Sequence, residues 1–168
     1  CISLGYGTGA IACDSSCQLD TSQCVTCTWQ WSPINMCPGF GCPEATIYHA
    51  AVWMPEYGKM WISGGIPTHN TSGHMYDPIA NDWESAVGCG TGDRPEAVWT
   101  GTRILKWYGG GGYYDPFTTV CDSIQSGSPA PTVDRWHSAI WTGTEMIVWG
   151  GGDTGTNYGA RYDPSTNT

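Results

Sequence analysis

Three stretches of the chain share one pattern of apolar and polar residues. Each has a short apolar strand that ends in Trp, then a tight polar turn, a second apolar strand and a pair of glycines. The stretches are HAAVWMPEYGKMWISGG (49–65), PEAVWTGTRILKWYGG (95–110) and HSAIWTGTEMIVWGG (137–151). Apolar runs of this length, bounded by Gly and Pro, are typical of strands and exclude long helices. The pattern predicts three copies of one β-structured repeat.

The tripeptide Tyr-Asp-Pro follows each stretch, at 76–78, 114–116 and 162–164. An Asp beside a Pro favours a turn, because its carboxylate can accept a backbone N–H. Seven residues after the first Tyr stands Trp83, and seven after the second stands Cys121, at the place of a fourth strand. Four short strands per repeat of about 45 residues indicate an all-β fold built from β-propeller blades.

These motifs resemble bacterial kelch repeats over residues 46–168, most closely in RWHSAIWTGTEMIVWGG and GARYDPSTNT. The resemblance implies kelch-type propeller blades, about three in this chain, with the glycine pairs near the axis. Propellers usually have four to eight blades, so we expect either part of a larger propeller or chains that complete one another. The middle repeat departs from the pattern at Lys106, where the third has Val148, and at Cys121, where Trp is expected.

Cysteines are concentrated at the start of the chain, with seven of the nine in the first 42 residues. This density favours disulfides, and therefore an extracellular or cell-surface location. Residues 1–24 resemble the cysteine-rich repeat of large surface proteins from myxobacteria and related groups, which implies a disulfide-held module over residues 1–26 with no catalytic role. We expect the disulfide framework to draw on Cys1, Cys13, Cys17, Cys24, Cys27, Cys37, Cys42, Cys89 and Cys121, with one thiol left free or paired outside this chain.

Two cysteine groups allow a more specific expectation. Cys89 and Cys121 lie in outer-edge segments of consecutive repeats, and we expect them to form a disulfide between neighbouring blades. The spacings C-x2-C at Cys24 and C-x4-C at Cys37 also fit a zinc site, although the surrounding cysteine density favours disulfides.

The kelch-like part is assigned to residues 27–168, and its first segment, 27–33, is a candidate shared strand. This segment carries Trp29 and Trp31 but has no other strands of its own, whereas the third repeat has no fourth strand beyond Tyr162. Pairing the two would satisfy an open sheet edge. Within one chain it would close a small ring, and between chains it would build a ring of subunits or a fibre.

Composition narrows the function. The net charge of −9 disfavours nucleic acid and anionic membranes as partners, and no apolar run approaches the ~20 residues of a membrane span. We find no catalytic constellation and expect no cofactor. The sequence favours a non-enzymatic extracellular binding, adhesion or structural module, whose partner is a protein or glycan at the cell surface or copies of itself.

Other functions stay open. One is a subunit of an extracellular fibre. Another is a carbohydrate-binding propeller, for which Trp31, Trp61 and Trp136 are the candidates because blade packing explains them least. A third is a copper oxidase, since some kelch propellers are copper oxidases. Ligand contacts are expected in the loops 66–74 and 152–160, which differ between repeats. Their candidate residues are His69, Asn70, His74, Asp153 and Asn157, of which Asn70 also opens a glycosylation sequon.

Overall fold

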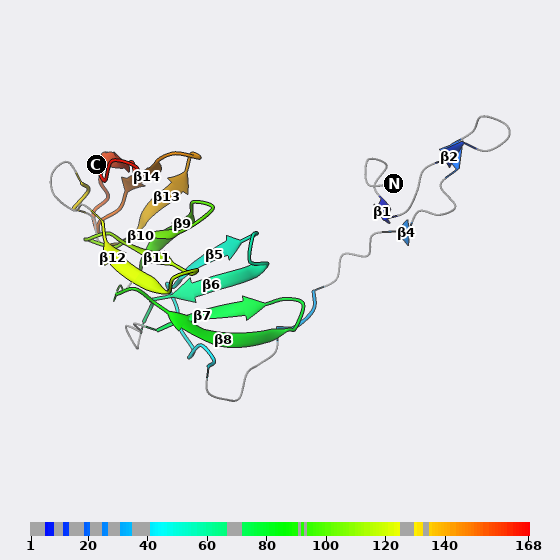
Figure 1. Ribbon diagram of the computed structural model, residues 1–168. Coiled ribbons are helices and arrows are strands. Elements are labelled where there is room, and N and C mark those ends of the chain that lie inside the picture. The colour runs from blue at the N-terminus through cyan, green and yellow to red at the C-terminus, as the bar shows by residue number, and fades with distance from the viewer. Residues whose placement is uncertain are drawn as a thin grey trace. The chain divides into compact units, whose positions relative to one another are not determined.

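The computed structural model spans residues 1–168. It describes residues 6–8, 12–13, 19–20, 25–26, 31–34, 41–66, 72–90, 92, 94–124, 130–132 and 135–168. The chain divides into an N-terminal unit, Cys1–Pro33, and a C-terminal unit, Ile34–Thr168, and each is described by itself. All regular structure in the described residues is β-structure (Figure 1). Over these residues, no helix is long and apolar enough to cross a membrane.

Two short antiparallel strand pairs make up the described part of the N-terminal unit. β1 (Tyr6–Thr8) pairs with β4 (Val25–Thr26). Between them in the sequence, β2 (Ala12–Cys13) pairs with β3 (Leu19–Asp20). This region is the one expected to be a small cysteine-rich module.

The C-terminal unit contains three antiparallel sheets, which follow one another along the chain. Sheet 1 consists of β5 (Ala50–Met54), β6 (Lys59–Ser63), β7 (Ser72–Asp77) and β8 (Asp82–Val87). Sheet 2 consists of β9 (Glu96–Trp99), β10 (Ile104–Trp107), β11 (Gly112–Asp115) and β12 (Val120–Ser123). Sheet 3 consists of β13 (His137–Trp141), β14 (Met146–Gly150) and β15 (Gly159–Tyr162). Each sheet is a meander, in which consecutive strands are neighbours.

The strand register confirms that the three sheets are copies of one pattern. In the first hairpin of each sheet, the last Trp faces an apolar residue of the next strand: Trp53 faces Met60, Trp99 faces Ile104 and Trp141 faces Met146. Counting from these pairs, Lys106 occupies the place of Ile62 in sheet 1 and of Val148 in sheet 3. The same count places Tyr108, rather than a glycine, at the position of Gly64 and Gly150.

The turn after each third strand is built as the Tyr-Asp-Pro motif predicts. The carboxylate of Asp77 accepts the backbone N–H groups of Ile79 (2.8 Å) and Ala80 (3.1 Å), and Asp115 does the same two and three residues on. In sheet 3, Asp163 accepts the N–H of Ser165 at 2.8 Å. The hydrogen bonds from Ala80 and Ile79 lower the pKa of Asp77 below its ordinary value, since they favour the charged carboxylate.

Apolar side chains of adjacent sheets form two core clusters. β9 contacts both β5 and β13, so the first strands of the three sheets lie next to one another (Figure 1). At the junction of sheets 1 and 2, called junction 1, the buried residues are Ala50, Val52, Met54, Trp61, Met75, Ile104 and Tyr114. At the junction of sheets 2 and 3, called junction 2, they are Val98, Leu105, Trp107, Ile124, Met146 and Val148. Each large side chain buried in this way contributes roughly 1.5–3 kcal/mol to stability.

The expectation of an all-β protein is therefore confirmed, and so is the repetition of a meander. The sheets do not close into a ring, and the propeller itself stays a prediction. The glycine pairs lie at or just after the ends of the second strands, whereas it is the first strands that contact one another. The expected shared strand over 27–33 does not extend through Trp31, Ser32 and Pro33, which form no strand, and its remaining residues lie outside the described ones. A proline lacks the N–H that a strand ladder needs.

Candidate functional site

The residue one or two positions before each repeat's first strand leads to the candidate site. By strand register, Tyr48, Arg94 and Trp136 occupy the same position in the three repeats. Because β5, β9 and β13 lie next to one another, these residues meet at one end of the first strands. We call the three residues the Arg94 cluster.

Arg94 is held between the two aromatic rings of this cluster. Its guanidinium carbon lies 4.3 Å from the centre of the Tyr48 ring and 4.6 Å from the centre of the Trp136 ring. The rings themselves are in edge contact, with centroids 5.3 Å apart and planes 82° apart. A cation over an aromatic face is attracted by the ring's quadrupole, so the two rings hold the guanidinium in place.

No carboxylate of the described residues forms an ion pair with Arg94, and its buried Nε has no hydrogen-bond partner there. Meanwhile the rings stay open to solvent, with Trp136 54% and Tyr48 42% exposed. Both aromatic residues have positive φ, 61° and 62°. Backbone strain of this kind is common at binding sites, and these side chains are not used to fill a core.

A cavity of about 120 Å³ adjoins the cluster and is also lined by His49, Pro95 and Glu96. The carboxyl of Glu96 is partly shielded from water, and this desolvation raises its pKa above the ordinary value. The site thus combines two open aromatic faces, an arginine with no acidic partner among the described residues, and a carboxyl that gains a proton more readily than usual. Such a set can bind a polar ligand by stacking and by hydrogen bonds, and it contains no nucleophile paired with a base.

A larger cavity, about 430 Å³, lies beside Lys106 and the Cys89–Cys121 disulfide. The Lys106 side chain is buried, and its ammonium donates hydrogen bonds to the carbonyls of Gly88 (2.8 Å) and Gly90 (3.0 Å). Burial lowers the pKa of Lys106 to about 8. Because its hydrogen bonds tie down the segment that connects sheet 1 to sheet 2, we assign Lys106 a structural role.

His74 lies in a different place from the one expected. It belongs to β7 and is buried, whereas the sequence suggested a loop residue. Its Nδ1 lies 2.9 Å from the carbonyl oxygen of Gly41. The third strand of sheet 1 has six residues, two more than in the other sheets, and so takes in the end of the expected loop.

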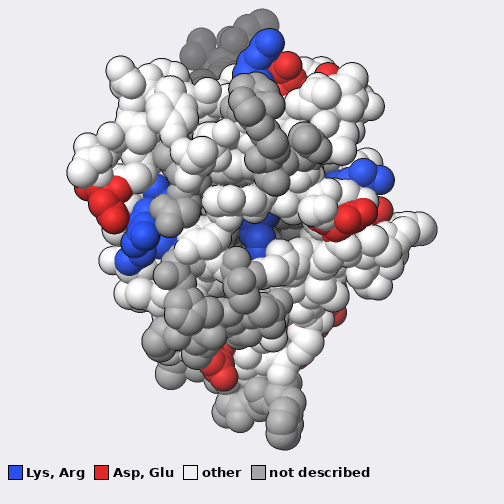
Figure 2. Space-filling model, turned by 90° about the vertical axis from the view of Figure 1, so that its left-hand side faces the viewer, with Lys and Arg blue, Asp and Glu red and all other residues white. Residues whose placement is uncertain are grey.

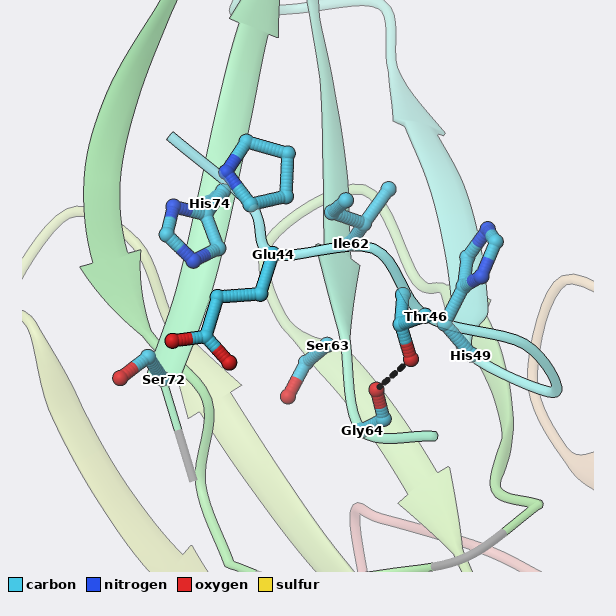
Figure 3. A pocket seen from close by; sticks show the side chains of 9 residues that line it. Glu44, Thr46, His49, Ile62, Ser63, Gly64, Ser72 and His74 are labelled. Atoms are coloured by element: carbon cyan, nitrogen blue, oxygen red, sulfur yellow. Dashed lines mark hydrogen bonds between the residues drawn. The ribbon is translucent and has the colours of Figure 1, made fainter. Parts of the chain in front are cut away.

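Figure 3 shows the small pocket beside His74, with Glu44 and Ser72 on the same side and Thr46 donating a hydrogen bond to the Gly64 carbonyl at 3.3 Å. Its volume of about 10 Å³ leaves room for one water molecule at most. An organic ligand is therefore excluded from this pocket as it stands.

The other candidate residues divide between the described and the undescribed parts of the chain. Asp153 and Asn157 are exposed in the loop before β15, as expected, and Asp153 forms an ion pair with Arg135 at 3.7 Å. His69, Asn70 and Trp29 lie outside the described residues. Tyr162 lies in β15, whose outer edge pairs with no strand among the described residues.

The three tryptophans considered for sugar binding lie in different environments. Trp61 is completely buried at junction 1, and its Nε1 donates a hydrogen bond to the Val87 carbonyl at 3.1 Å, so its expected availability to a sugar is wrong. Its ring stacks on Tyr114 in the neighbouring sheet. Trp31 is exposed in the N-terminal unit. Trp136 alone of the three belongs to a described cluster that adjoins a cavity.

The disulfide between neighbouring sheets is confirmed. Cys89 follows β8 and Cys121 lies in β12, and their Cα atoms are 5.3 Å apart. Cys42 is also disulfide-bonded, which excludes it as a zinc ligand and agrees with the preferred interpretation. The bonding of Cys1, Cys13, Cys17, Cys24, Cys27 and Cys37 lies outside what the structure describes. Over the described residues, no group of three or more His, Cys, Asp or Glu side chains is arranged to hold a metal ion.

Charged side chains are sparse on the face shown in Figure 2, where small patches of both signs are separated by uncharged surface. No protein family model matches the chain, and no curated protein matches it either.

The sequence interpretation missed Tyr48 and Arg94. The repeats were aligned from His49, Pro95 and His137, one position after the cluster. A signal was present, because two aromatic residues and an arginine directly precede those three starts. Its meaning depends on knowing that the first strands lie side by side.

Proposed function

We propose that this chain is a non-enzymatic, extracellular binding module of the kelch β-propeller type, and that it binds a cell-surface ligand at the Arg94 cluster. One observation carries this proposal. Each of the three repeats contributes one residue at the same position, just before its first strand, and together they form an open cluster beside a cavity. The core does not use these rings, since both are about half-exposed.

An extracellular location agrees with the disulfide chemistry. The Cys89–Cys121 bond and the bonded Cys42 need an oxidising compartment. The net charge of −9 disfavours nucleic acid as the partner, which leaves a protein or a glycan on a bacterial surface.

The test is binding of the labelled full chain to intact bacterial cells and to an array of bacterial glycans. We expect Trp136→Ala to lower binding about tenfold or more, because a central aromatic anchor carries much of the affinity of a site. The matched control is Trp149→Ala, which removes a side chain that is 59% exposed but does not line the cavity. Equal binding by both variants would exclude the Arg94 cluster as the binding site.

A second candidate function is a subunit of an extracellular fibre joined by strand sharing. It is favoured by the outer edge of β15, which is open in the described residues although sheets 1 and 2 have a fourth strand there. The turn at the end of the chain already has the form that leads into a fourth strand, since Asp163 and Thr168 exchange backbone hydrogen bonds of 2.7 and 3.3 Å. Sedimentation velocity over a hundredfold range of concentration tests it, and a monomer at all concentrations contradicts it.

A further inference from the structure

We propose that the Arg94 cluster recognises a carboxylate-bearing sugar, a uronic acid residue of a surface glycan, with the guanidinium of Arg94 binding the carboxylate and the ring of Trp136 stacking on the sugar. This inference rests on the proposed function and names the ligand class for the same site.

The guanidinium of Arg94 is prepared for a carboxylate. Its guanidinium carbon lies over the rings of Tyr48 and Trp136, so ring contacts rather than an ion pair with a described residue hold it in place. Nε is buried and has no partner among the described residues, and an unsatisfied buried donor is costly until a ligand fills it. A carboxylate matches the planar fork of an arginine with two parallel hydrogen bonds. None of the described acidic residues already fills this position.

The size of the cavity agrees with a carboxylate group at the end of a larger ligand. Its volume of about 120 Å³ leaves room for a carboxylate group. The remainder of the ligand would lie against the half-exposed rings.

Those rings favour a sugar over an acidic side chain of a protein. The flat C–H face of a pyranose covers an aromatic face, whereas the thin, flexible stem of Asp or Glu buries little of it. Trp136 and Tyr48 offer such faces at a net-negative protein, which would repel a densely charged acidic partner. A single carboxylate on an otherwise neutral sugar offers both a flat C–H face for the rings and a low density of negative charge.

Glu96 offers a way to detect a carboxylate ligand in the cavity. It lines the same cavity, and a like charge close to a bound carboxylate weakens binding. Glu96→Gln removes this repulsion with little change in shape, so it should strengthen binding of a uronide and leave binding of a neutral sugar unchanged.

The test is NMR titration of the full-length chain with methyl β-D-glucuronide, methyl β-D-glucoside and N-acetylglutamate N-methylamide. We expect the glucuronide to shift the indole N–H signal of Trp136 and to bind at least about tenfold more tightly than the glucoside. The glutamate derivative carries the same carboxylate without a sugar ring, and should bind at least about tenfold more weakly than the glucuronide.

Variants assign the effect to the arginine. Arg94→Gln should weaken glucuronide binding about tenfold or more, and Arg94→Lys, which keeps the charge but loses the fork, should weaken it several-fold. The matched control is Arg103→Gln, because Arg103 also lies over a tyrosine ring, at 4.6 Å from the centre of Tyr113, but does not line the cavity. Should Arg94→Gln not fold, Arg94→Lys and Glu96→Gln decide the matter alone.

Three results would overturn the inference: equal binding of glucoside and glucuronide, equal binding of the glutamate derivative, or glucuronide binding unchanged in Arg94→Lys and Glu96→Gln. Failure of the proposed function looks different. If a neutral glycan or a protein binds and Trp136→Ala abolishes that binding, the binding function stands and the uronic acid ligand is wrong. If cells and arrays bind neither the wild type nor any variant, both are wrong.

Discussion

The two junctions between the sheets are built from the same repeat but are held in different ways. Junction 2 is held by an apolar cluster that includes Trp107, Met146 and Val148. Junction 1 also has an apolar cluster, but the connection between sheets 1 and 2 adds a disulfide and a buried lysine. The two departures from the repeat pattern, at Cys121 and Lys106, thus occur at the same junction.

The difference shows how departures from a repeat can be compensated locally. Lys106 brings a charge into a position that is apolar in the other sheets, and it satisfies that charge with the carbonyls of Gly88 and Gly90. Cys121 replaces a large aromatic residue, and its bond to Cys89 fixes the residue between those two glycines. Both changes act on the segment 88–90, so junction 1 gains covalent and polar restraint where junction 2 relies on packing.

The largest effect that separates the junctions should come from Trp107→Ala. Trp107 is 2% exposed, and removing a buried Trp costs about 3–5 kcal/mol. Since no described disulfide links sheets 2 and 3, we expect sheet 3 to lose its packing before the rest. Hydrogen exchange should show the amides of β13–β15 exposed in the variant while those of β5–β8 remain protected.

A milder pair of variants serves as the control for this result. Trp107→Phe should cost little, because the Trp107 Nε1 is buried without a hydrogen-bond partner. Trp61→Phe should cost about 1 kcal/mol more, because it removes the donor that Trp61 supplies to the part-buried Val87 carbonyl. Simultaneous loss of protection in sheets 1 and 3 of Trp107→Ala would contradict the separate roles of the junctions.

Removing the disulfide should leave junction 1 dependent mainly on packing, as junction 2 is. The bond closes a loop across a sequence separation of 32 residues, and a cross-link of this kind contributes about 2–4 kcal/mol. We therefore expect the double variant Cys89→Ser, Cys121→Ser to lose about that much stability in urea titration. If the double variant has the same urea midpoint and the same free energy of unfolding as the wild type, packing alone holds junction 1.

Lys106 should make the stability of junction 1 depend on pH. Its pKa is about 8 in the folded chain and about 10.4 in an unfolded one, so the unfolded state binds more protons between these values. Stability should therefore rise as the pH increases from 8 towards 10, by about 3 kcal/mol over the full interval. Below pH 8 both states carry the charge, and Lys106 adds no further pH dependence.

Lys106→Met is the variant that tests this assignment. It keeps the volume of the side chain and removes the charge, so the rise in stability above pH 8 should disappear in urea titrations at pH 7, 8, 9 and 9.5. Lys59→Met is the control, because Lys59 forms an exposed ion pair with Glu84 at 2.7 Å. A slope that persists in Lys106→Met would assign the effect to another group.

The parts of the fold that the sequence could predict are those that depend on residues close together in one repeat or at a fixed spacing between repeats. The strands, the Tyr-Asp-Pro turns and the Cys89–Cys121 bond each depend on residues at fixed spacing, and all were found. His74 was misplaced because the length of a third strand depends on how far its neighbour extends, and β8 is six residues long. Trp61 was misjudged for a related reason, since its burial depends on the neighbouring sheet rather than on its own repeat.

The candidate site was harder to predict because it is assembled across repeats. Nothing in the local sequence of Arg94 distinguishes it from an exposed loop arginine. Its partners are 46 residues before it and 42 after it in the sequence. They become neighbours only because β5, β9 and β13 lie side by side. The repeat alignment carries that information once the register of the first hairpins is known.

The smallest predicted effect is the loss of stability in Gly151→Ala, measured against Gly110→Ala. Gly151 follows the last residue of β14 in sheet 3. Gly151 has a φ of 99°, and a Cβ there would lie 2.6 Å from the backbone oxygen of Arg135. Gly110 has open space around it and does not adopt a positive φ. Gly151→Ala should therefore cost about 1–3 kcal/mol in thermal unfolding, and Gly110→Ala should change stability by less than about 1 kcal/mol.

The same pair of variants links junction 2 to the ligand site. Gly151 packs against the backbone of Arg135 and the side chain of His137, on either side of Trp136. To accommodate a new Cβ at Gly151, this segment has to move, and Trp136 has to move with it. We expect Gly151→Ala to weaken ligand binding at the Arg94 cluster and Gly110→Ala to leave it unchanged. If Gly151→Ala lowers stability but binds as the wild type does, the position of Trp136 is set by its contacts with Tyr48 and Arg94 rather than by the strand that follows it.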